Sequence, residues 1–566
     1  MTGNIYLQNF DYVAILIYIA LMAVIGFTFG WLVKDSNSFF KGGGTIPWVM
    51  ATITNYMGLF STFVFVAYAG IAYKEGIISM VVFLTTVPGC LVAGLIFGAR
   101  WRRTGDTTPV EYLEKRYGYP MRKLVMWLGL VMRFLDNMVR LYAIGIFIAA
   151  VTPISFGWAI VISGVIVTLF NIIGGIWTVT IMSTVQFIIL ILVTAILLPL
   201  SLDASGGLSA LAAKFPEHLE PFNGPKGSWL WLTVYCLMVT LKYNENWTFI
   251  QKFYCVRDES AARKVGIYSG ILFLLFTPIF LIPAVVSPLI VPNIADPEMS
   301  YVMISSKLLP VGVMGIMFSS MFAATMSSLN AEYNIMAGVI TTDIYQRMIN
   351  PNADGKKLLN VARISTIIVG VIMILGAFGV KNFGGAFEAN KLFTGILAIP
   401  IGIPLILGII ARSPTQNSSI ATIVVGVVVG LANFCNSCVI NMIPQISWEL
   451  GTLIEMAVCV AIYYYPVFSK SRVYSEAEKL LFKKIETPIP ENEKPDISPE
   501  YIRSLVYLFV FSMVVAGLLF GGMSLPTVNT TGGLYGVIAG GLCVLSAGGI
   551  YLVYSQSKAK KALSKK

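Results

Sequence analysis

The stretch "MFAATMSSLN" (residues 321–330) lies in the middle of a long apolar run, between "VGVMGIMFSS" and "AEYNIMAGVI". A run of this length and composition indicates a helix that crosses a membrane. Its centre nevertheless carries Ser327, Ser328 and Asn330, and polar groups in lipid are costly unless another group meets them. The stretch therefore indicates either a functional site or a tightly packed helix face inside a membrane protein.

The whole chain has the composition of a polytopic membrane protein. Of its 566 residues, 57% are hydrophobic and 12% are charged, which is about half the charged share of ordinary soluble domains. The mean hydropathy is +0.79. Most apolar segments reach the ~20 residues that span a bilayer as a helix, and lipid favours helices because they pair their own backbone groups. We predict fifteen spans, at about 11–33, 47–73, 75–99, 123–152, 157–175, 180–200, 229–246, 267–292, 311–342, 361–380, 391–411, 417–440, 446–466, 504–524 and 533–554.

Several classes of function are disfavoured by the residues present. His218 is the single histidine, so we expect no His-based catalytic or metal site, and no nucleotide-binding glycine motif is visible. The net charge is +11, and the tail "SKAKKALSKK" (557–566) is expected to contact anionic membrane lipid. No nucleic-acid-binding fold accompanies this charge. We therefore expect no enzyme activity, no nucleic-acid partner and no obligate protein partner.

Lysine and arginine residues are distributed unevenly between the two sides of the membrane. The loops are assigned alternately to the inside and the outside, starting from an N-terminus outside. With residues at segment ends counted in the loops, the inside loops and the tail hold 30 of the 39, the outside loops 6 and the membrane segments 3. Cytoplasmic loops attract Lys and Arg. The distribution predicts an N-terminus outside and a C-terminus in the cytoplasm.

The segments fall into two groups of five, 47–200 and 229–411, that start in opposite orientations. Each group opens with a helix that has a polar interruption: Gly58, Ser61 and Thr62 in the first, and "KYNEN" (242–246) in the second. Such a pattern is typical of an inverted-repeat transporter with broken first helices and a midplane site. The predicted divisions are an extra helix and inside loop (1–46), the first repeat (47–200), an outside loop (201–228), the second repeat (229–411), two additional helices (412–469), a cytoplasmic loop (470–503), and two C-terminal helices with the basic tail (504–566).

The polar centre of the 311–342 segment has two interpretations. Ser320, Ala324, Ser327, Ser328 and Ala331 share one helix face. They form either a close-packing face, with hydroxyls bonded to carbonyls one turn earlier, or a cation site. Sodium prefers oxygen ligands, and two hydroxyls with freed carbonyls supply them without a carboxylate, so that the ion can leave again.

Five stretches of the chain give a resemblance to a known family: "DSNSFFKGGGTIPW", "TPVEYLEKRYG", "GGIWTVTIMSTVQ", "NENWTFIQK" and "AATMSSLNAEYNIMAGVITTDIY". Over residues 11–412 the chain resembles the sodium:solute symporter family, which includes bacterial sugar, proline and sialic acid transporters. The resemblance implies a leucine-transporter-type fold, a bacterial inner (plasma) membrane location and sodium as the coupling ion. It places the shared sodium site at the carbonyls of Met57, Phe60 and Ala324 and the hydroxyls of Ser327 and Ser328.

The chain also departs from the family pattern. Many members carry an aspartate, linked to a second sodium, where this chain has Ser183. The polar residues of the sugar-transporting members are replaced here, among others by Phe83. Asp136 and Arg140 lie one turn apart in the 123–152 segment, either as a structural pair or, with Lys242, as part of a site for a carboxylate-bearing solute. The candidate solute-binding residues are Ser61, Thr62, Phe83, Asp136, Arg140, Lys242, Tyr243 and Asn246.

Two classes of function remain after these steps. The first is a sodium-coupled symporter that imports a small organic solute by alternating access, the solute being a carboxylate or, as an alternative, a neutral sugar. The second is a membrane solute sensor that uses the same fold. A sensor would carry a signalling domain, and neither 470–503 nor the last twelve residues resemble one.

Overall fold

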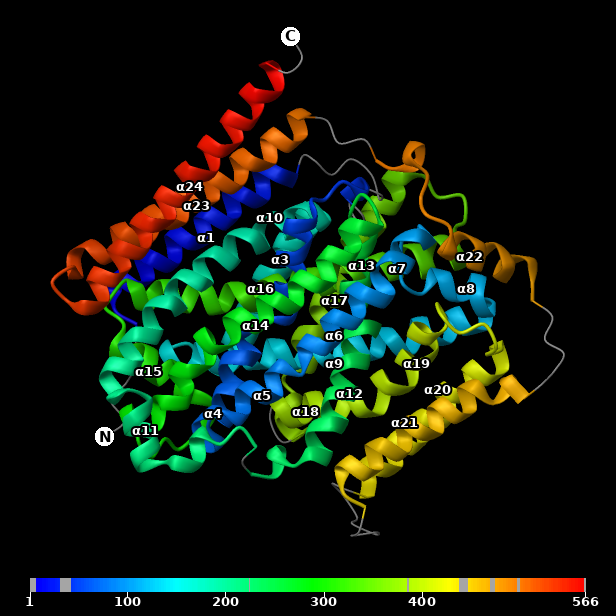
Figure 1. Ribbon diagram of the computed structural model, residues 1–566, viewed down its shortest axis with the longest axis horizontal. Helices are drawn as coiled ribbons and strands as arrows, with labels where there is room; N and C mark the ends of the chain where they lie inside the picture. The colour runs from blue at the N-terminus through cyan, green and yellow to red at the C-terminus, as the bar shows by residue number, and fades with distance from the viewer. Residues whose placement is uncertain are drawn as a thin grey trace.

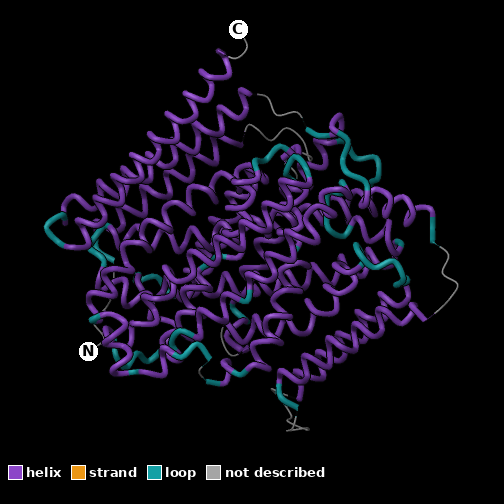
Figure 2. Tube along the Cα trace, in the orientation of Figure 1, coloured by secondary structure: helices purple, strands orange, loops and turns teal. Residues whose placement is uncertain are grey.

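The computed structural model describes residues 7–30, 42–222, 224–383, 386–436, 446–468, 474–495 and 499–563. All regular elements in these ranges are helices, and loops join them at their ends (Figures 1 and 2). The basic tail predicted to contact lipid lies where side chains are not described. The longer helices are α1 (Asn9–Gly30), α9 (Tyr119–Val151), α10 (Phe156–Ser205), α14 (Glu259–Ile290), α16 (Val313–Val339), α17 (Gly355–Ala377), α20 (Gln416–Phe434), α21 (Trp448–Tyr464), α23 (Pro499–Ser524) and α24 (Thr531–Leu563).

The first helix of the first repeat is broken where the sequence predicts it. Helix α3 (Trp48–Leu59) ends at Phe60, which is extended (φ −81, ψ 121). The chain then continues as η2 (Val64–Tyr68) and α4 (Ala69–Glu75), and the two halves are bent by 56°. The bend exposes carbonyls that a continuous helix would use internally, and it places them inside the protein rather than in lipid.

The first helix of the second predicted repeat is also interrupted. Helix α12 (Trp229–Glu245) stops at Asn246, which is extended (φ −65, ψ 120), and α13 (Trp247–Tyr254) starts directly after it. The Asn246 side chain accepts a hydrogen bond from the Thr248 backbone and so caps α13. The first helices of the two predicted repeats, 47–200 and 229–411, are therefore both interrupted, in agreement with the sequence-based expectation of polar breaks.

The remaining elements of the two repeats are shorter or interrupted. The span Ile78–Thr104 combines α5 (Ile78–Leu84), α6 (Thr86–Val92), η3 (Ala93–Phe97) and α7 (Gly98–Thr104). In the second repeat, α18 (Ala386–Phe393), η9 (Thr394–Ala398) and α19 (Ile399–Leu407) form one span. Helix α16 continues as η7 (Ile340–Ile349), and α15 (Ser300–Leu308) precedes it.

Helix α10 differs from the expectation of two separate segments at 157–175 and 180–200. The structure assigns one helical element over both, yet the element folds back on itself. Ser163 and Tyr18 line the same small cavity, while the Tyr18 hydroxyl accepts a hydrogen bond from Gln186 (3.2 Å). A straight helix would separate positions 163 and 186 by about 35 Å, so α10 contains two arms that run back along each other.

The described residues contain nine helices that are long and apolar enough to cross a membrane, or ten with the bent α3–α4 pair counted as one span. The chain is therefore a multi-pass membrane protein, whereas fifteen spans remain a prediction. Helix α16 is not among these helices because its polar centre lowers its hydropathy, although every residue of α16 is buried. Its position inside the protein is what allows this polarity.

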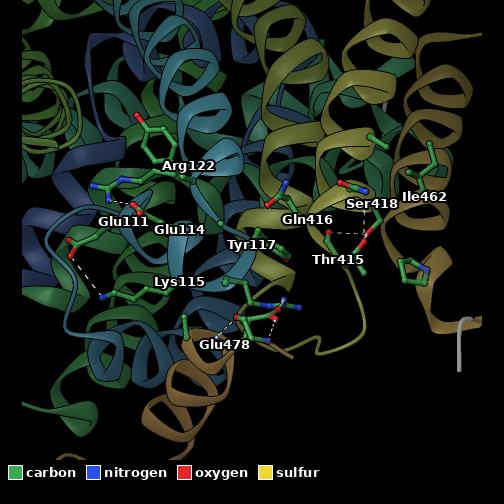
Figure 3. Close-up of a pocket in the computed structure, with 18 of the residues that line it drawn as sticks. Glu111, Glu114, Lys115, Tyr117, Arg122, Thr415, Gln416, Ser418, Ile462 and Glu478 are labelled. Atoms are coloured by element: carbon green, nitrogen blue, oxygen red, sulfur yellow. Dashed lines mark hydrogen bonds and ion pairs between the residues drawn. The ribbon is translucent and has the colours of Figure 1, made fainter. Parts of the chain in front are cut away.

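The stretch "TPVEYLEKRYG" (108–118) forms an elbow that contacts both the chain after α19 and a helix of the segment 470–503. Arg116 of α8 (Glu111–Tyr117) donates to the carbonyls of Gly408 (3.1 Å) and Ala411 (2.7 Å) after α19, and pairs with Glu478 of α22 (Glu476–Glu486) at 2.6 Å. A cavity of about 1760 Å³ opens beside it, between charged elbow side chains and the polar start of α20 (Figure 3).

Candidate functional site

The polar face of α16 meets the break in α3. The Thr62 hydroxyl donates to the Met321 carbonyl (2.9 Å), and the Thr62 backbone N–H donates to the Thr325 hydroxyl (2.8 Å). These residues are 259 and more positions apart in the chain. The broken helix of the first repeat therefore contacts the serine-bearing helix of the second, as the predicted sodium site requires.

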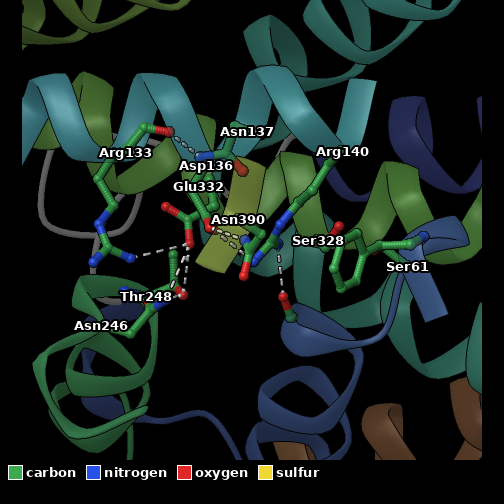
Figure 4. A network of polar contacts seen from close by, with 12 residues as sticks. Ser61, Arg133, Asp136, Asn137, Arg140, Asn246, Thr248, Ser328, Glu332 and Asn390 are labelled. Atoms are coloured by element: carbon green, nitrogen blue, oxygen red, sulfur yellow. Dashed lines mark hydrogen bonds and ion pairs between the residues drawn. The ribbon is translucent and has the colours of Figure 1, made fainter. Parts of the chain in front are cut away.

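The predicted sodium ligands all lie in this buried region. All five are buried, with Ser327 the most exposed at 1%. The Ser328 hydroxyl donates to the Thr325 carbonyl (2.9 Å), one turn earlier. Ser61 and Ser328 lie on the same side of the polar network, beyond Arg140 (Figure 4).

Ser183, which stands where many family members carry an aspartate, lies next to the serine pair of Ser327 and Ser328. Its hydroxyl is 2.6 Å from that of Ser327 and donates to the Val179 carbonyl (2.7 Å). An aspartate at this position would bring a negative charge to the serines. Ser183 supplies only a neutral hydroxyl there.

Asp136 of α9 is the centre of a buried polar cluster. Its carboxylate is 3.2 Å from Arg140 Nη2, 2.8 Å from Lys242 Nζ and 2.6 Å from Asn390 Nδ2. Lys242 also donates to Asn390 (3.1 Å) and Thr394 (2.9 Å). Two cations thus share one carboxylate, and the cluster carries a net charge of +1 in a region screened from water.

Arg140 also connects this cluster to the break in α3. Its Nη1 donates to the Gly58 carbonyl at 3.0 Å, while Nη2 contacts Asp136 (Figure 4). The planar guanidinium reaches the two acceptors through two separate nitrogens held in a fixed geometry, whereas an ammonium offers a single nitrogen. The expected Asp136–Arg140 pair exists, and it is part of a larger assembly.

A second ionic cluster lies one turn away along α9, at the break between α12 and α13. Arg133 is 2.5 Å from Glu245 and 3.8 Å from Glu332, and all three side chains are buried. Glu332 also accepts long contacts from Asn246 (3.5 Å) and Thr248 (3.3 Å). The candidate site residues from the sequence omitted Arg133, Glu245 and Glu332. All three are charged residues inside apolar segments, and this feature of the sequence could have identified them as candidates.

Two candidate solute-binding residues lie in different surroundings. The Tyr243 hydroxyl accepts a hydrogen bond from Asn55 (2.6 Å), and its ring stacks on Phe249. Phe83 packs against the rings of Phe60 and Tyr68. Among the described contacts, none joins Tyr243 or Phe83 to Asp136. Asn246 contacts Glu332 instead of Asp136, whereas Arg140 and Lys242 are in the Asp136 cluster as expected.

Comparison with known proteins gives the same fold and family. The chain is 22% identical over 497 residues to a sodium/glucose cotransporter of Vibrio parahaemolyticus, covering 80% of this chain and 90% of the relative. It is 23% identical over 449 residues to the sodium/sialic acid symporter NanT of Aliivibrio fischeri, covering 74% and 86%.

A solved Na+-coupled sialic acid symporter in an outward-open state superimposes with a TM-score of 0.72 at 17% identity, over 83% of this chain and 99% of that one. This likeness supports the leucine-transporter-type fold. Family membership supports sodium-coupled solute symport, with sodium as the coupling ion, by a transporter rather than an enzyme. The family model for the sodium:solute symporter family matches residues 39–464, and the chain belongs to this family.

Proposed function

We propose that the protein couples the entry of sodium to the uptake of a small solute that bears a carboxylate, by alternating access around the Asp136 cluster. The observation that carries the choice of solute is the charge of this cluster. Arg140 and Lys242 share the single carboxylate of Asp136. The neighbouring cluster of Arg133, Glu245 and Glu332 carries the opposite net charge, so the positive excess is local to Arg140 and Lys242. A solute carboxylate would give these two cations a second charged partner where only Asp136 now serves both.

Lys242 is the cation that a solute reaches most readily. Its side chain retains 15% of its accessible surface, compared with 8% for Arg140 and 3% for Asp136. The solute carboxylate would bind at Lys242 and Arg140, while Asp136 and Asn390 hold these groups in place. Ser61 and Thr62, at the break in α3, would lie at the sodium-facing end of the same site.

Sodium would bind between the break in α3 and the centre of α16. The proposed ligands are the carbonyls of Met57, Phe60 and Ala324 and the hydroxyls of Ser327 and Ser328. The support is the contact between these two elements through Thr62 and Thr325. Because no carboxylate is among the ligands, binding would be weak enough for release on the inside. The N-terminus would lie outside and the C-terminus inside a bacterial inner membrane.

A neutral sugar is the second candidate solute, because one relative is named a sodium/glucose cotransporter. Against it, Phe83 and its aromatic neighbours present few hydrogen-bonding groups. The two candidates differ in what Arg140 does. A carboxylate needs the guanidinium directly, whereas a hexose does not.

Uptake by purified protein in liposomes tests the proposal. Labelled monocarboxylates, amino acids, acidic sugars and hexoses are offered with an inward sodium gradient and, separately, with potassium. We expect sodium-dependent uptake of a carboxylate and at least tenfold slower uptake by Arg140→Lys, because the ammonium loses one of two parallel contacts. Arg263→Lys on the exposed side of α14 is the matched control.

The outcomes separate the parts of the proposal. Sodium-dependent uptake of a hexose alone, or normal uptake by Arg140→Lys, would refute the carboxylate and leave sodium coupling intact. Uptake that is identical in sodium and potassium would refute the coupling itself. Binding of a solute without any transport would favour a sensor.

A further inference from the structure

A groove of about 470 Å³ lies between the first turns of α3 and α14 and one part of the C-terminal hairpin of α23 and α24. On the core side it is lined by the first residues of α3 and the first two turns of α14. On the hairpin side it is lined by Val506, Phe509 and Ile550. Figure 1 shows this hairpin along one edge of the molecule, beside α1.

One end of the groove is basic. Lys264 Nζ lies 5.3 Å from the centre of the Trp48 ring, and the lysine forms no ion pair within the described residues. Arg257 lines the same end and is 3.0 Å from Glu491, but that carboxylate is 73% exposed and is also 2.6 Å from Lys494. The Asp258 carboxylate accepts the Ala261 N–H (2.9 Å) and thereby caps α14. Among the described charged groups here, Arg257, Lys264 and Lys494 are positive, and Asp258 and Glu491 are negative.

The remaining lining of the groove is largely apolar, and part of it is exposed. Val49 is 44% exposed and Ile550 is 38% exposed. Both lie on helices of a membrane protein, so the medium that their exposed surface meets is lipid. Trp48 and Tyr268 form a ring pair at 5.0 Å next to the basic end. Aromatic residues gather where hydrocarbon meets the headgroups, and α3 and α14 both begin here. This combination of aromatic, apolar and basic residues is the one expected of a groove at the boundary of the hydrocarbon region, with its cations at headgroup level.

We propose that this groove binds an anionic phospholipid. The phosphate would lie at Lys264 and Arg257, and an acyl chain would lie between Val49 and the hairpin residues Phe509 and Ile550. Basic pockets between transmembrane helices are suited to anionic headgroups. The lipid would fill the space between the core and the hairpin, and the site is separate from the proposed solute and sodium sites.

Native mass spectrometry of the full-length protein in detergent tests this site. The protein is titrated with phosphatidylglycerol, with phosphatidylcholine of the same acyl chains, and with glycerol phosphate as the headgroup alone. We expect preferential retention of phosphatidylglycerol and about fivefold weaker binding for Lys264→Gln, because one basic residue contributes about this factor. Val49→Trp, which narrows the apolar end, should weaken the same binding with Lys264 intact.

Lys356→Gln, an exposed lysine at the start of α17, is the matched control and should retain wild-type binding. Equal retention of the two lipids would overturn the proposal, as would unchanged phosphatidylglycerol binding in both Lys264→Gln and Val49→Trp. Glycerol phosphate that binds as tightly as the lipid would show an anion site without a lipid and would also overturn it.

Discussion

Replacing either serine of the pair on α16 by alanine should weaken sodium binding without unfolding the protein. The Ser328 hydroxyl donates to the Thr325 carbonyl and that of Ser327 contacts Ser183, so the oxygens keep lone pairs for a cation. In Ser327→Ala, Ser183 retains its bond to the Val179 carbonyl, and no polar group is left without a partner. The fold should therefore tolerate both changes.

The magnitude follows from the loss of one oxygen ligand in a site with few ligands. An unmet polar interaction in a buried site costs about 1–3 kcal/mol. At 1.4 kcal/mol per tenfold, this corresponds to a sodium affinity that is roughly fivefold to 150-fold weaker. Both Ser327→Ala and Ser328→Ala should fall in this range.

The assay does not require knowledge of the solute. A ligand that binds only the folded state raises its stability with concentration, so the thermal unfolding midpoint is measured against sodium chloride, with potassium chloride at equal ionic strength. Ser319→Ala is the matched control, since within the part of the chain that the structure describes its hydroxyl donates to the Gly315 carbonyl of the same helix (2.9 Å) and contacts no proposed sodium ligand. If all three variants respond to sodium as the wild type does, the serine pair only packs α16 and the proposed sodium site is wrong.

Three further predictions concern coupling, topology and pH. Because Ser183 brings no carboxylate to the serine pair, we expect one sodium per solute from reversal potentials in liposomes; a ratio of two would refute this and make Glu332 the next candidate. A reporter fused to the C-terminus should report a cytoplasmic location, and a periplasmic signal would show that the predicted number of spans is wrong by one. Burial lowers the pKa of His218, in the loop before α12, below its usual 6.5, so the unfolded state binds the proton more tightly. The free energy of unfolding should therefore fall as the pH drops below about 6.5. The thermal midpoint should differ less between pH 7.5 and 5.5 in His218→Gln than in the wild type. An equal difference in the two proteins would contradict this role of His218.

The sequence by itself predicted the features that depend on residues close together along the chain. The length of the apolar segments predicted membrane helices. The polar residues at 58–62 and 242–246 predicted the two breaks, because the backbone groups that an interrupted helix leaves unpaired need polar partners. The spacing of Asp136 and Arg140 predicted their contact, since residues four apart share a helix face. The stretches shared with the family predicted the family and the fold.

Only the tertiary structure decided which distant groups meet. Asp136 binds Lys242 and Asn390, which are 106 and 254 positions away, and Arg133 joins carboxylates from two further helices. Helical periodicity defines the face of a residue but not the helix that packs against it. The same limit explains why Tyr243, next to Lys242, contacts Asn55 instead: adjacent residues on a helix point about 100° apart, and packing of the two repeats selected which of them faces the central cluster.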